Sequence, residues 1–496
     1  MNPLKKLAGQ TAIYGLPTIL GRLLNYLLVP LYTRVFVPEE YGIVTEMYAY
    51  VSFLFVLLTY GMETAFFRFA GQEEQRGKVF GTALTSLVAT SSVFLFFTFG
   101  SASFLAGKLG YSDHTEYVKW FALILAADVI STIPYANLRL KNKAFRFAAV
   151  KFINILSNIG FNLFFIVACP AILDHFPGST IAGFIGMFYS ADIGIGYIFI
   201  SNLLASLITL VLLLPEISPA SLKPDRELLK KMLAYSWPLL IFGMAGIVNE
   251  TFDRIILKHL ITDKSDAMVQ LGIYGACYKV SILMTLFIQT YRYAAEPFFF
   301  DQAGKKDARK TYATTMHYFI IICLFIFLAI TMYLDFVMHF VGKSYREGVQ
   351  VVPVLLLANM FLGVFYNLSV WFKLTDKTKT GALISFAGAV VTVVLNFLLI
   401  PLMGYMGAAW ATLACYAFMM VLSYLIGQRY YRIEYDLKSA LKYLVAALII
   451  YFLASLELLD ITWTRLLLNT MLLLLFMVFV YSSEKQRFMA EVNKGY

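Results

Sequence analysis

The stretch YGLPTILGRLLNYLLVPLYTR, Tyr14 to Arg34, is long and apolar enough to cross a lipid bilayer, yet Arg22 lies near its middle. About 20 mostly apolar residues in a helix span the hydrocarbon core of a membrane. A charged side chain at the bilayer centre costs about 2.5–3.5 kcal/mol, so it faces protein or water rather than lipid. The stretch therefore predicts a transmembrane helix with one polar face.

The whole chain has the composition of an integral membrane protein. Of its 496 residues, 60% are hydrophobic and 14% are charged, whereas about 25% are charged in an average soluble domain. The mean hydropathy is +0.73. Apolar runs of about 20 residues recur from one end to the other, and no stretch is left over for a sizeable soluble domain.

We predict an all-α integral membrane protein with about fourteen transmembrane helices. The expected spans are residues 11–33, 43–66, 82–105, 117–138, 147–169, 193–214, 233–253, 271–296, 314–337, 349–372, 381–401, 405–427, 439–456 and 462–482. Residues 175–192 are apolar but rich in Gly and Pro, so they are expected to lie in the membrane interface or to re-enter the membrane. The first span is too long for a signal peptide, and no small-residue cleavage site follows it.

The distribution of Lys and Arg predicts the orientation of these spans. Segments on the side of the N-terminus hold 27 of them and segments on the other side hold 9, while Arg22, Lys151, Lys279 and Arg292 lie within spans. Because Lys and Arg concentrate in cytoplasmic loops, both termini are expected to be cytoplasmic. The formal net charge of +10 is then mainly a topology signal, and no nucleic-acid partner is expected.

Motifs of enzymes and cofactor sites are missing from the sequence. The four cysteines all fall within expected spans and lack metal-ligand spacing. No HExxH pair, P-loop, GxSxG or glycine-rich dinucleotide turn occurs in a suitable loop. We therefore expect no metal, no cofactor and no enzymatic activity.

The two halves of the sequence resemble one another, as in an internal repeat. The first and seventh spans both begin with Tyr-x-x-Pro, and Asn162 and Asn396 follow similar loop sequences at the same spacing. Each half holds six spans in the same orientation, which predicts two pseudo-symmetric six-helix lobes around a central cavity. The predicted parts are an N-lobe (1–214), a cytoplasmic linker (215–232), a C-lobe (233–427), and two C-terminal spans with a cytoplasmic tail (428–496).

The order of several segments resembles that of Wzx-type polysaccharide transporters. These segments are GQTAIYGLPTILGRLLNYLLVPLYTRVFVPEEYG (9–42), FDRIIL (252–257), GIYGACYKV (272–280), YRYAAEPFFF (291–300) and GYMGAAWAT (404–412). The family comprises lipid-linked oligosaccharide flippases of the multidrug/oligosaccharidyl-lipid/polysaccharide (MOP) exporter superfamily. The resemblance implies a MOP/MATE-like fold. It also implies transfer of an undecaprenyl-pyrophosphate-linked glycan (O-antigen, capsule or exopolysaccharide) to the outer leaflet by alternating access.

The same resemblance implies a bacterial cytoplasmic (inner) membrane location and several partners. These are the polyprenyl-pyrophosphate-linked glycan, membrane lipids, a polysaccharide polymerase, chain-length proteins and a coupling H⁺ or Na⁺. A flippase for a lipid-II-type peptidoglycan precursor is the nearest alternative function. A MATE-like cation-coupled multidrug antiporter is a second, although it favours twelve spans and acidic cavity residues. An enzyme such as a polymerase or ligase would need a large outer loop, and the longest one here has about 23 residues.

Polar residues near mid-depth are the candidate binding residues of the first half. Thr18, Arg22 and Asn25 recur at helical spacing on one face of the first span. This face fits a water-filled cavity in which the guanidinium grips a pyrophosphate, although a buried ion pair that fixes lobe packing is the alternative. Asp128, in the fourth span, is the expected partner of Arg22 and equally a candidate site for the coupling ion.

The fifth span carries a second polar stripe, made of Lys151, Asn154, Asn158 and Asn162. Its repeat mate, the eleventh span, carries Asn396. Because an unpaired amide is costly in lipid, we predict that these residues line the cavity. Hydrogen bonds between helices and, for Lys151, snorkelling to the membrane surface are the alternatives.

Lys279 and Arg292 are the candidate cavity cations of the second half. They lie about 140° apart around an ideal helix, and Arg292 is expected to pair with Glu296 four residues on. Asp253 and Arg254, near the outer end of the seventh span, are expected at a gate or boundary. The last two spans are either lipid-exposed or form a groove for the polyprenyl tail.

The charge count predicts the sidedness of every loop. Reporters fused after residues 40, 112, 180 and 265 should report an outside location, and those after 75, 142, 225 and 307 an inside location. Alkaline phosphatase and green fluorescent protein fusions measure the two outcomes. Two or more misplaced reporters would show that the span assignment is wrong.

Overall fold

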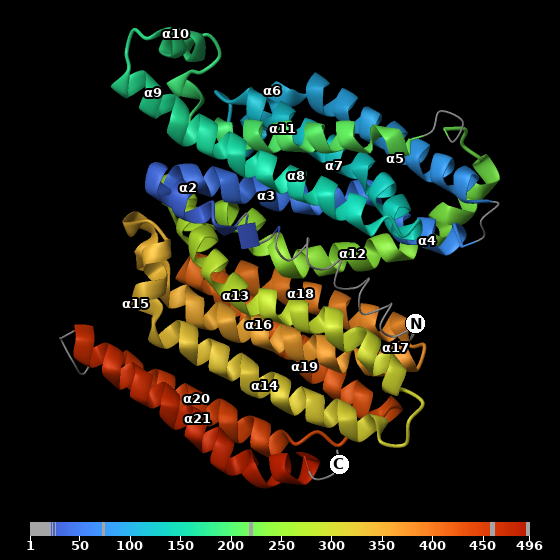
Figure 1. The fold of residues 1–496 in the computed structure, drawn as a ribbon, viewed down its shortest axis with the longest axis vertical. Helices are drawn as coiled ribbons and strands as arrows, with labels where there is room; N and C mark the ends of the chain where they lie inside the picture. Colours follow the sequence, from blue (N-terminus) through green and yellow to red (C-terminus); the bar gives the residue numbers. More distant parts are fainter. Residues whose placement is uncertain are drawn as a thin grey trace. The chain divides into compact units, whose positions relative to one another are not determined.

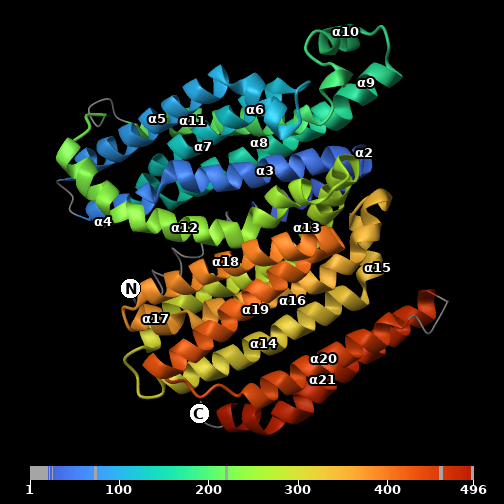
Figure 2. The same ribbon diagram turned by 180° about the vertical axis from the view of Figure 1, so that it is seen from behind.

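The computed structural model describes residues 21, 23–24, 26–71, 75–217, 222–456 and 462–492. The regular structure of these residues is helical and includes no strand. By the contacts between residues, the chain divides into unit 1, Met1–His259 with Asp263–Gly272, and unit 2, Leu260–Thr262 with Ile273–Tyr496. Figures 1 and 2 show the helices from opposite sides.

The helices of unit 1 are joined by short connections. They are α2 (Val29–Val35), α3 (Pro38–Thr59), α4 (Met62–Phe69), α5 (Arg76–Gly100), α6 (Ala102–Leu109), α7 (Thr115–Leu140), α8 (Ala144–Leu163), α9 (Cys169–His175), α10 (Thr180–Gly186), α11 (Gly196–Leu213) and α12 (Arg226–Leu260). A π-helical turn, η2 (Phe164–Ala168), joins α8 to α9, and short turns η3 (Ala191–Ile193) and η4 (Leu214–Glu216) flank α11.

The next helix, α13 (Lys264–Gln302), begins in unit 1 and continues into unit 2. The remaining helices of unit 2 are α14 (Ala308–Met332), α15 (Leu334–Val337), α16 (Val351–Leu368), α17 (Val370–Leu374), α18 (Thr378–Met403), α19 (Tyr405–Tyr430), α20 (Leu437–Ser455) and α21 (Thr462–Val492). Two 3₁₀ segments, η6 (Met338–Phe340) and η7 (Lys343–Gln350), lie between α15 and α16.

Thirteen helical segments of the described residues are long and apolar enough to cross a membrane, by length and composition. They match the second to the fourteenth expected spans one for one and in order. Most of the first expected span lies outside the described residues, which include its end in α2. The prediction of an all-α, multi-pass membrane protein is confirmed.

The helix α12 begins at Arg226, within the segment predicted to be a linker, and its contacts place it in unit 1. The carboxylate of Asp225 sets this start, because its Oδ1 accepts a hydrogen bond from the backbone N–H of Leu228 at 2.8 Å. That N–H and the Lys78 ammonium lower the pKa of Asp225, so the cap is ionised at neutral pH. The division into two six-helix lobes stays a prediction.

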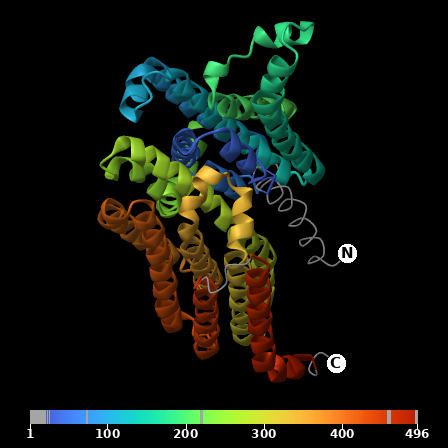
Figure 3. The same cartoon turned by 90° about the vertical axis from the view of Figure 1, so that its left-hand side faces the viewer.

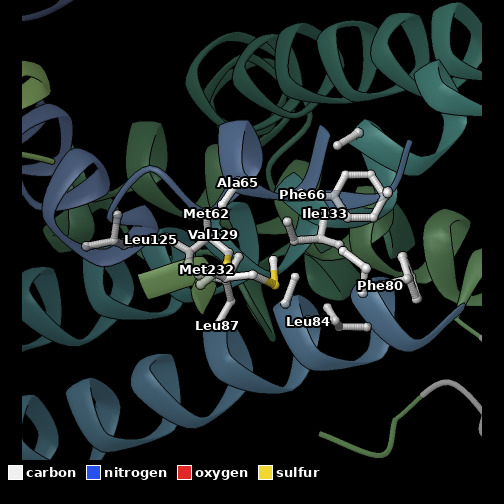
Figure 4. Close-up of a cluster of buried hydrophobic side chains, with 14 residues drawn as sticks. Met62, Ala65, Phe66, Phe80, Leu84, Leu87, Leu125, Val129, Ile133 and Met232 are labelled. Carbon is white, nitrogen blue, oxygen red and sulfur yellow. The ribbon is translucent and has the colours of Figure 1, made fainter. Parts of the chain in front are cut away.

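A buried apolar cluster in unit 1 connects α12 to α4, α5 and α7. Met62 and Phe66 of α4, Leu84 of α5, Val129 of α7 and Met232 of α12 are fully buried, and Figure 4 shows their side chains packed together. Lipid tails are as apolar as these side chains, so close van der Waals packing holds the helices together.

The connection between α8 and α11, which includes α9 and α10, projects from one end of unit 1 (Figures 1 and 3). Ile181 and Phe184 of α10 are exposed, and Met187 just after it has 83% of its surface exposed. Large apolar side chains exposed on a short helix are typical of a segment that lies in the membrane interface. The interfacial or re-entrant placement of residues 175–192 stays a prediction.

A close helix crossing in unit 1 joins α3 to the first turns of α13. Gly42 of α3 faces the carbonyl oxygen of Met268, and Gly272 of α13 faces that of Pro38. A Cβ atom at either glycine would overlap the facing oxygen. The crossing therefore requires a glycine in both helices.

Replacing Gly272 with Ala should lower the free energy of unfolding by about 1–3 kcal/mol, because rigid backbone opposes the added methyl group. Thermal unfolding of purified protein in detergent measures the change. Gly160→Ala in α8 is the matched control, since no atom lies within 4 Å of the added Cβ. Equal unfolding temperatures for the two variants would contradict the crossing.

Candidate functional site

Arg22 and Asn25, the candidate residues of the first span, lie outside the described residues. The end of that span packs against α8. The Tyr32 hydroxyl of α2 donates to Asn162 Oδ1 at 2.9 Å, and both side chains are buried. The predicted pairing of Arg22 with Asp128 stays a prediction.

Asp128 of α7 lies in a polar cluster within unit 1. The Ser206 hydroxyl of α11 donates to Asp128 Oδ1 at 2.8 Å. Lys151 of α8 is close enough to Asp128 to interact with it electrostatically, and its ammonium lies 4.2 Å from the centre of the Tyr135 ring. The Asp128 carboxylate thus has a hydroxyl group and a lysine of two other helices beside it.

The helix α11 supplies the other partners of this cluster. The Asn154 amide of α8 donates to Thr209 Oγ1 at 2.9 Å and to the Ala205 carbonyl at 3.1 Å. The Asn202 amide donates to the Tyr48 hydroxyl of α3 at 2.8 Å. The polar cluster thus joins α3, α7, α8 and α11 around Asp128.

Sequence reasoning missed the contribution of α11. Asn202, Ser206 and Thr209 recur at i, i+4 and i+7, which places them on one helix face. None of these three residues was among the predicted site residues. Its spacing is the same signal that singled out the residues of α8.

The other two amides of the α8 stripe lie one and two turns beyond Asn154. Asn162 is fully buried, and its amide donates to the Asn158 carbonyl at 2.7 Å while its oxygen accepts from Tyr32. Asn154 and Asn162 therefore hold α8 to α11 and α2. The cavity-lining role of this stripe stays a prediction.

The candidate residues of unit 2 lie in separate surroundings. Arg292 is paired with Glu296 at 2.9 Å, as expected, and Lys373 lies 2.6 Å from the same carboxylate. Asn396 of α18 is fully buried, and its amide donates to the carbonyl of Thr392 in the same helix at 2.7 Å. Lys279 is half-buried in α13.

Asp253 and Arg254 interact locally near the end of α12. Asp253 has 3% of its surface exposed, and its Oδ1 accepts from the Arg254 backbone N–H at 2.8 Å. The Arg254 guanidinium donates to the Glu250 carbonyl one turn back, at 2.7 Å. The pair thus stiffens this part of α12, and its role at a gate stays a prediction.

A buried ion pair joins the end of α12 to the start of α3. Lys258 Nζ lies 2.9 Å from Glu46 Oε2 and donates to the Leu109 carbonyl at 2.5 Å. The Tyr111 hydroxyl donates to the same Glu46 oxygen, and its ring lies 4.3 Å from the Lys258 ammonium. Glu46 is fully buried and 15% of the Lys258 side chain is exposed. We name Glu46, Tyr111 and Lys258 the α3–α12 clamp.

Tyr111 lies in the connection before α7, outside the membrane-spanning segments. Burial raises the pKa of its hydroxyl, and the Glu46 carboxylate raises that pKa further. The hydroxyl therefore stays protonated and acts as a donor. Sequence reasoning missed the clamp, because Glu46, Tyr111 and Lys258 lie far apart in the chain and no local pattern joins them.

The opposite end of unit 1 has ion pairs of its own. Arg139 of α7 pairs with Glu63 of α4. The Glu216 carboxylate, with 3% of its side chain exposed, lies 3.3 Å from Lys143 Nζ and 3.2 Å from Arg146 Nε. Paired charges thus connect the helices at both ends of unit 1, whereas the polar cluster around Asp128 connects them in the middle.

Solved structures with a similar fold are transporters and flippases. "Lipid II flippase MurJ, inward closed conformation" matches with a TM-score of 0.66 and 14% identity, covering 95% of this chain and 99% of that one. A MATE family multidrug resistance transporter of the MOP superfamily matches with a TM-score of 0.59 and 14% identity, covering 86% and 94%. A mutant of the Vibrio cholerae MATE transporter VcmN matches with a TM-score of 0.55 and 13% identity, covering 86% and 97%. None of the curated proteins compared by sequence matches.

The described residues thus have the fold of the MurJ and MATE structures, with thirteen helices that are long and apolar enough to cross a membrane. The family model described as "Polysaccharide biosynthesis protein" matches residues 7–303, which is more than half of the chain. The chain therefore belongs to this family, which confirms the resemblance to polysaccharide transporters found in the sequence.

A double-mutant cycle on Glu46 and Lys258 tests the α3–α12 clamp. Glu46→Gln alone should lower the free energy of unfolding by about 3–5 kcal/mol, because it leaves Lys258 buried without its counter-charge. Lys258→Met in the same background should restore much of the loss. Chemical unfolding in detergent measures both.

The exposed pair of Lys305 and Asp301 is the matched control for this cycle, since 57% and 33% of its side chains are exposed. Its coupling energy should be only about 0.2–1 kcal/mol. A Glu46–Lys258 coupling no larger than that would show that the clamp does not stabilise the fold.

Proposed function

We propose that the protein moves an undecaprenyl-pyrophosphate-linked oligosaccharide from the cytoplasmic to the outer leaflet of the bacterial cytoplasmic membrane. The glycan is a repeat unit of O-antigen, capsule or exopolysaccharide. Membership of the polysaccharide biosynthesis family favours this substrate over a drug or a peptidoglycan precursor. A flippase-like fold supports the transport of a lipid-linked substrate, and the bias of Lys and Arg supports cytoplasmic termini.

The pyrophosphate is the part of the substrate that the hydrocarbon core opposes most strongly, since its charge has to be moved through lipid. In this proposal Arg22, Asn25 and Lys151 receive it in the first half, and Lys279, Arg292 and Asn396 line the path in the second half. Lys151 supports this role because it is a half-buried cation next to the polar cluster around Asp128. Guanidinium groups suit bidentate contacts with phosphates.

Ion coupling is assigned to Asp128. No nucleotide-binding motif occurs in the sequence, so an ion gradient is the proposed energy source. A membrane potential supplies about 2.3 kcal/mol per elementary charge per 100 mV. Asp128 accepts from Ser206 and interacts with Lys151, so a proton or Na⁺ at its carboxylate would compete with the lysine. Loading of the ion would thereby free Lys151 for the substrate.

Alternating access requires one side of the transporter to stay closed while the other side is open. We assign the closure of the outer side to the α3–α12 clamp and to the glycine crossing of α3 with α13. Asp253 and Arg254 lie within two turns of Lys258 on α12, which supports their assignment to the same boundary. Opening of this side would break the buried Glu46–Lys258 pair.

Purified protein in liposomes should translocate lipid-linked oligosaccharide slowly without a gradient and faster with an imposed proton or Na⁺ gradient. Asp128→Asn keeps the size of the side chain but removes its charge, so it should abolish only the acceleration. Protection of the glycan from an added glycosidase measures translocation. Translocation of lipid II at an equal rate would favour the peptidoglycan-precursor alternative.

Two further variants separate the roles in this experiment. Asp113→Asn is the matched control, since Asp113 is exposed outside the membrane-spanning segments, and it should behave as the parent protein. Arg22→Gln should abolish translocation with and without the gradient at normal protein abundance. An Asp128→Asn protein that the gradient still accelerates would move the coupling role to another residue.

A further inference from the structure

Two cations of unit 2 share one carboxylate oxygen. The Arg292 guanidinium of α13 donates to Glu296 Oε1 at 2.9 Å, and the Lys373 ammonium of α17 donates to the same oxygen at 2.6 Å. A phosphate oxygen at this point would therefore have the same two charged donors. The proposed function uses Arg292 and leaves Glu296 and Lys373 unexplained.

Contacts other than the ion pairs position the two cations. Phe299 of α13 and Val370 of α17 belong to one buried apolar cluster, so packing brings the two helices together beside the ion pairs. The Arg292 guanidinium lies 4.6 Å from the centre of the Tyr366 ring of α16, a contact that suits its planar shape. The two cations would thus stay close together without the carboxylate of Glu296.

The cluster lies near the cytoplasmic ends of its helices, by the expected orientation. Glu296 ends the eighth expected span and Lys373 directly follows the tenth, and the Lys and Arg count places both ends on the cytoplasmic side. Phosphates of lipids in the cytoplasmic leaflet lie at this depth, in the headgroup region. A lipid-linked diphosphate would therefore meet the cluster before it is moved across the membrane.

Glu296 can leave the two cations at little cost. The side chains are partly exposed, by 45% for Arg292, 38% for Glu296 and 27% for Lys373. Partly exposed ion pairs contribute little to stability, because water can replace either partner. A diphosphate carries more charge and more acceptor oxygens than a carboxylate, so it can replace Glu296 at both cations.

An equivalent ion pair in unit 1 shows which part of the cluster is additional. Glu63 of α4 and Arg139 of α7 pair with each other. They precede Glu296 and Lys373 by 233 and 234 residues, so a pair of carboxylate and cation is common to both halves of the expected repeat. A threonine takes the place of Arg292 in unit 1. The arginine is thus an addition of unit 2, beyond what joining two helices requires.

We propose that Glu296 is an internal competitor of the substrate, which holds Arg292 and Lys373 until the diphosphate of the lipid-linked substrate displaces it. The inference rests on the proposed function, which supplies that substrate. Lys373 thereby joins Arg292 as a ligand of the diphosphate. Because the displaced carboxylate stays one helical turn from Arg292, it can return to the cations when the substrate moves on, and so assists release.

Isothermal titration calorimetry of the purified full-length protein in detergent with farnesyl diphosphate, a short lipid-linked diphosphate, tests this competition without a need for transport. Glu296→Gln keeps the size of the side chain but removes the competing charge, so it should raise the affinity about five-fold, the effect of an exposed ion pair. Lys373→Gln should lower the affinity about ten-fold, because a charged hydrogen bond to the diphosphate is lost. Lys373→Arg keeps the charge and should retain most of the affinity.

Asp301→Asn is the matched control for Glu296→Gln. Asp301 lies on the same helix and pairs with Lys305 at 3.0 Å, so its substitution removes one negative charge away from the two cations. This variant should bind farnesyl diphosphate as the parent protein does. Phosphatidylglycerol and inorganic pyrophosphate should each bind the parent about ten-fold more weakly, since the first has one phosphate and the second has no apolar chain.

Several outcomes would overturn the inference. An equal rise in affinity for Glu296→Gln and Asp301→Asn would show an effect of net charge alone, and an unchanged affinity of Lys373→Gln would remove the lysine from the site. Phosphatidylglycerol that binds as tightly as farnesyl diphosphate would identify a site for any lipid phosphate. These results leave the proposed function in place. A parent protein that binds inorganic pyrophosphate equally well, or no farnesyl diphosphate at all, would contradict the proposed function together with the inference.

Discussion

A polar group among these helices has to find its partner inside the protein, because hydrocarbon offers none. This constraint accounts for most of the specific contacts in both units. In unit 1, Oε2 of Glu46 contacts Lys258 and Tyr111, and Oδ1 of Asp128 accepts from Ser206. In unit 2 the carboxylate of Glu484 is met by Tyr443 and His317. Apolar packing fills the remaining volume without selecting which helices meet.

The same constraint separates rigid from changeable parts of unit 1. Asn154 and Asn162 use their amides between helices, and such neutral bonds can persist through a transport cycle. The charged groups differ, since an ion or a substrate phosphate competes directly for a lysine or a carboxylate. Asp128 and Lys151 are therefore the residues at which ligand binding would alter the contacts between α7, α8 and α11.

The sequence predicts the membrane spans well because hydropathy is a local property. At the majority of their ends, the second to fourteenth spans agree with the helices of the structure within a few residues. Asp128 was also identifiable as a polar residue at mid-depth, and Lys151 and Asn154 as members of a polar stripe. Their partners were not, because the rotation and depth of α11 decide that Ser206 rather than a neighbouring residue meets Asp128. The pairing of His317 with Glu484 joins residues 167 positions apart, which no local pattern indicates.

The glycine crossing has a consequence for the history of the chain. Gly42 and Gly272 lie in the second and eighth spans, which are repeat mates if the two halves arose by duplication. Each glycine makes room for a carbonyl group of the other helix, so a larger residue at one position is not compensated by any change at the other. Most side chains of the two halves were free to diverge in pairs, but these two were not. The two glycines are not equivalent positions of the repeat, because they are 230 residues apart whereas Asn162 and Asn396 are 234 apart. The crossing itself, and not common descent, therefore accounts for both glycines.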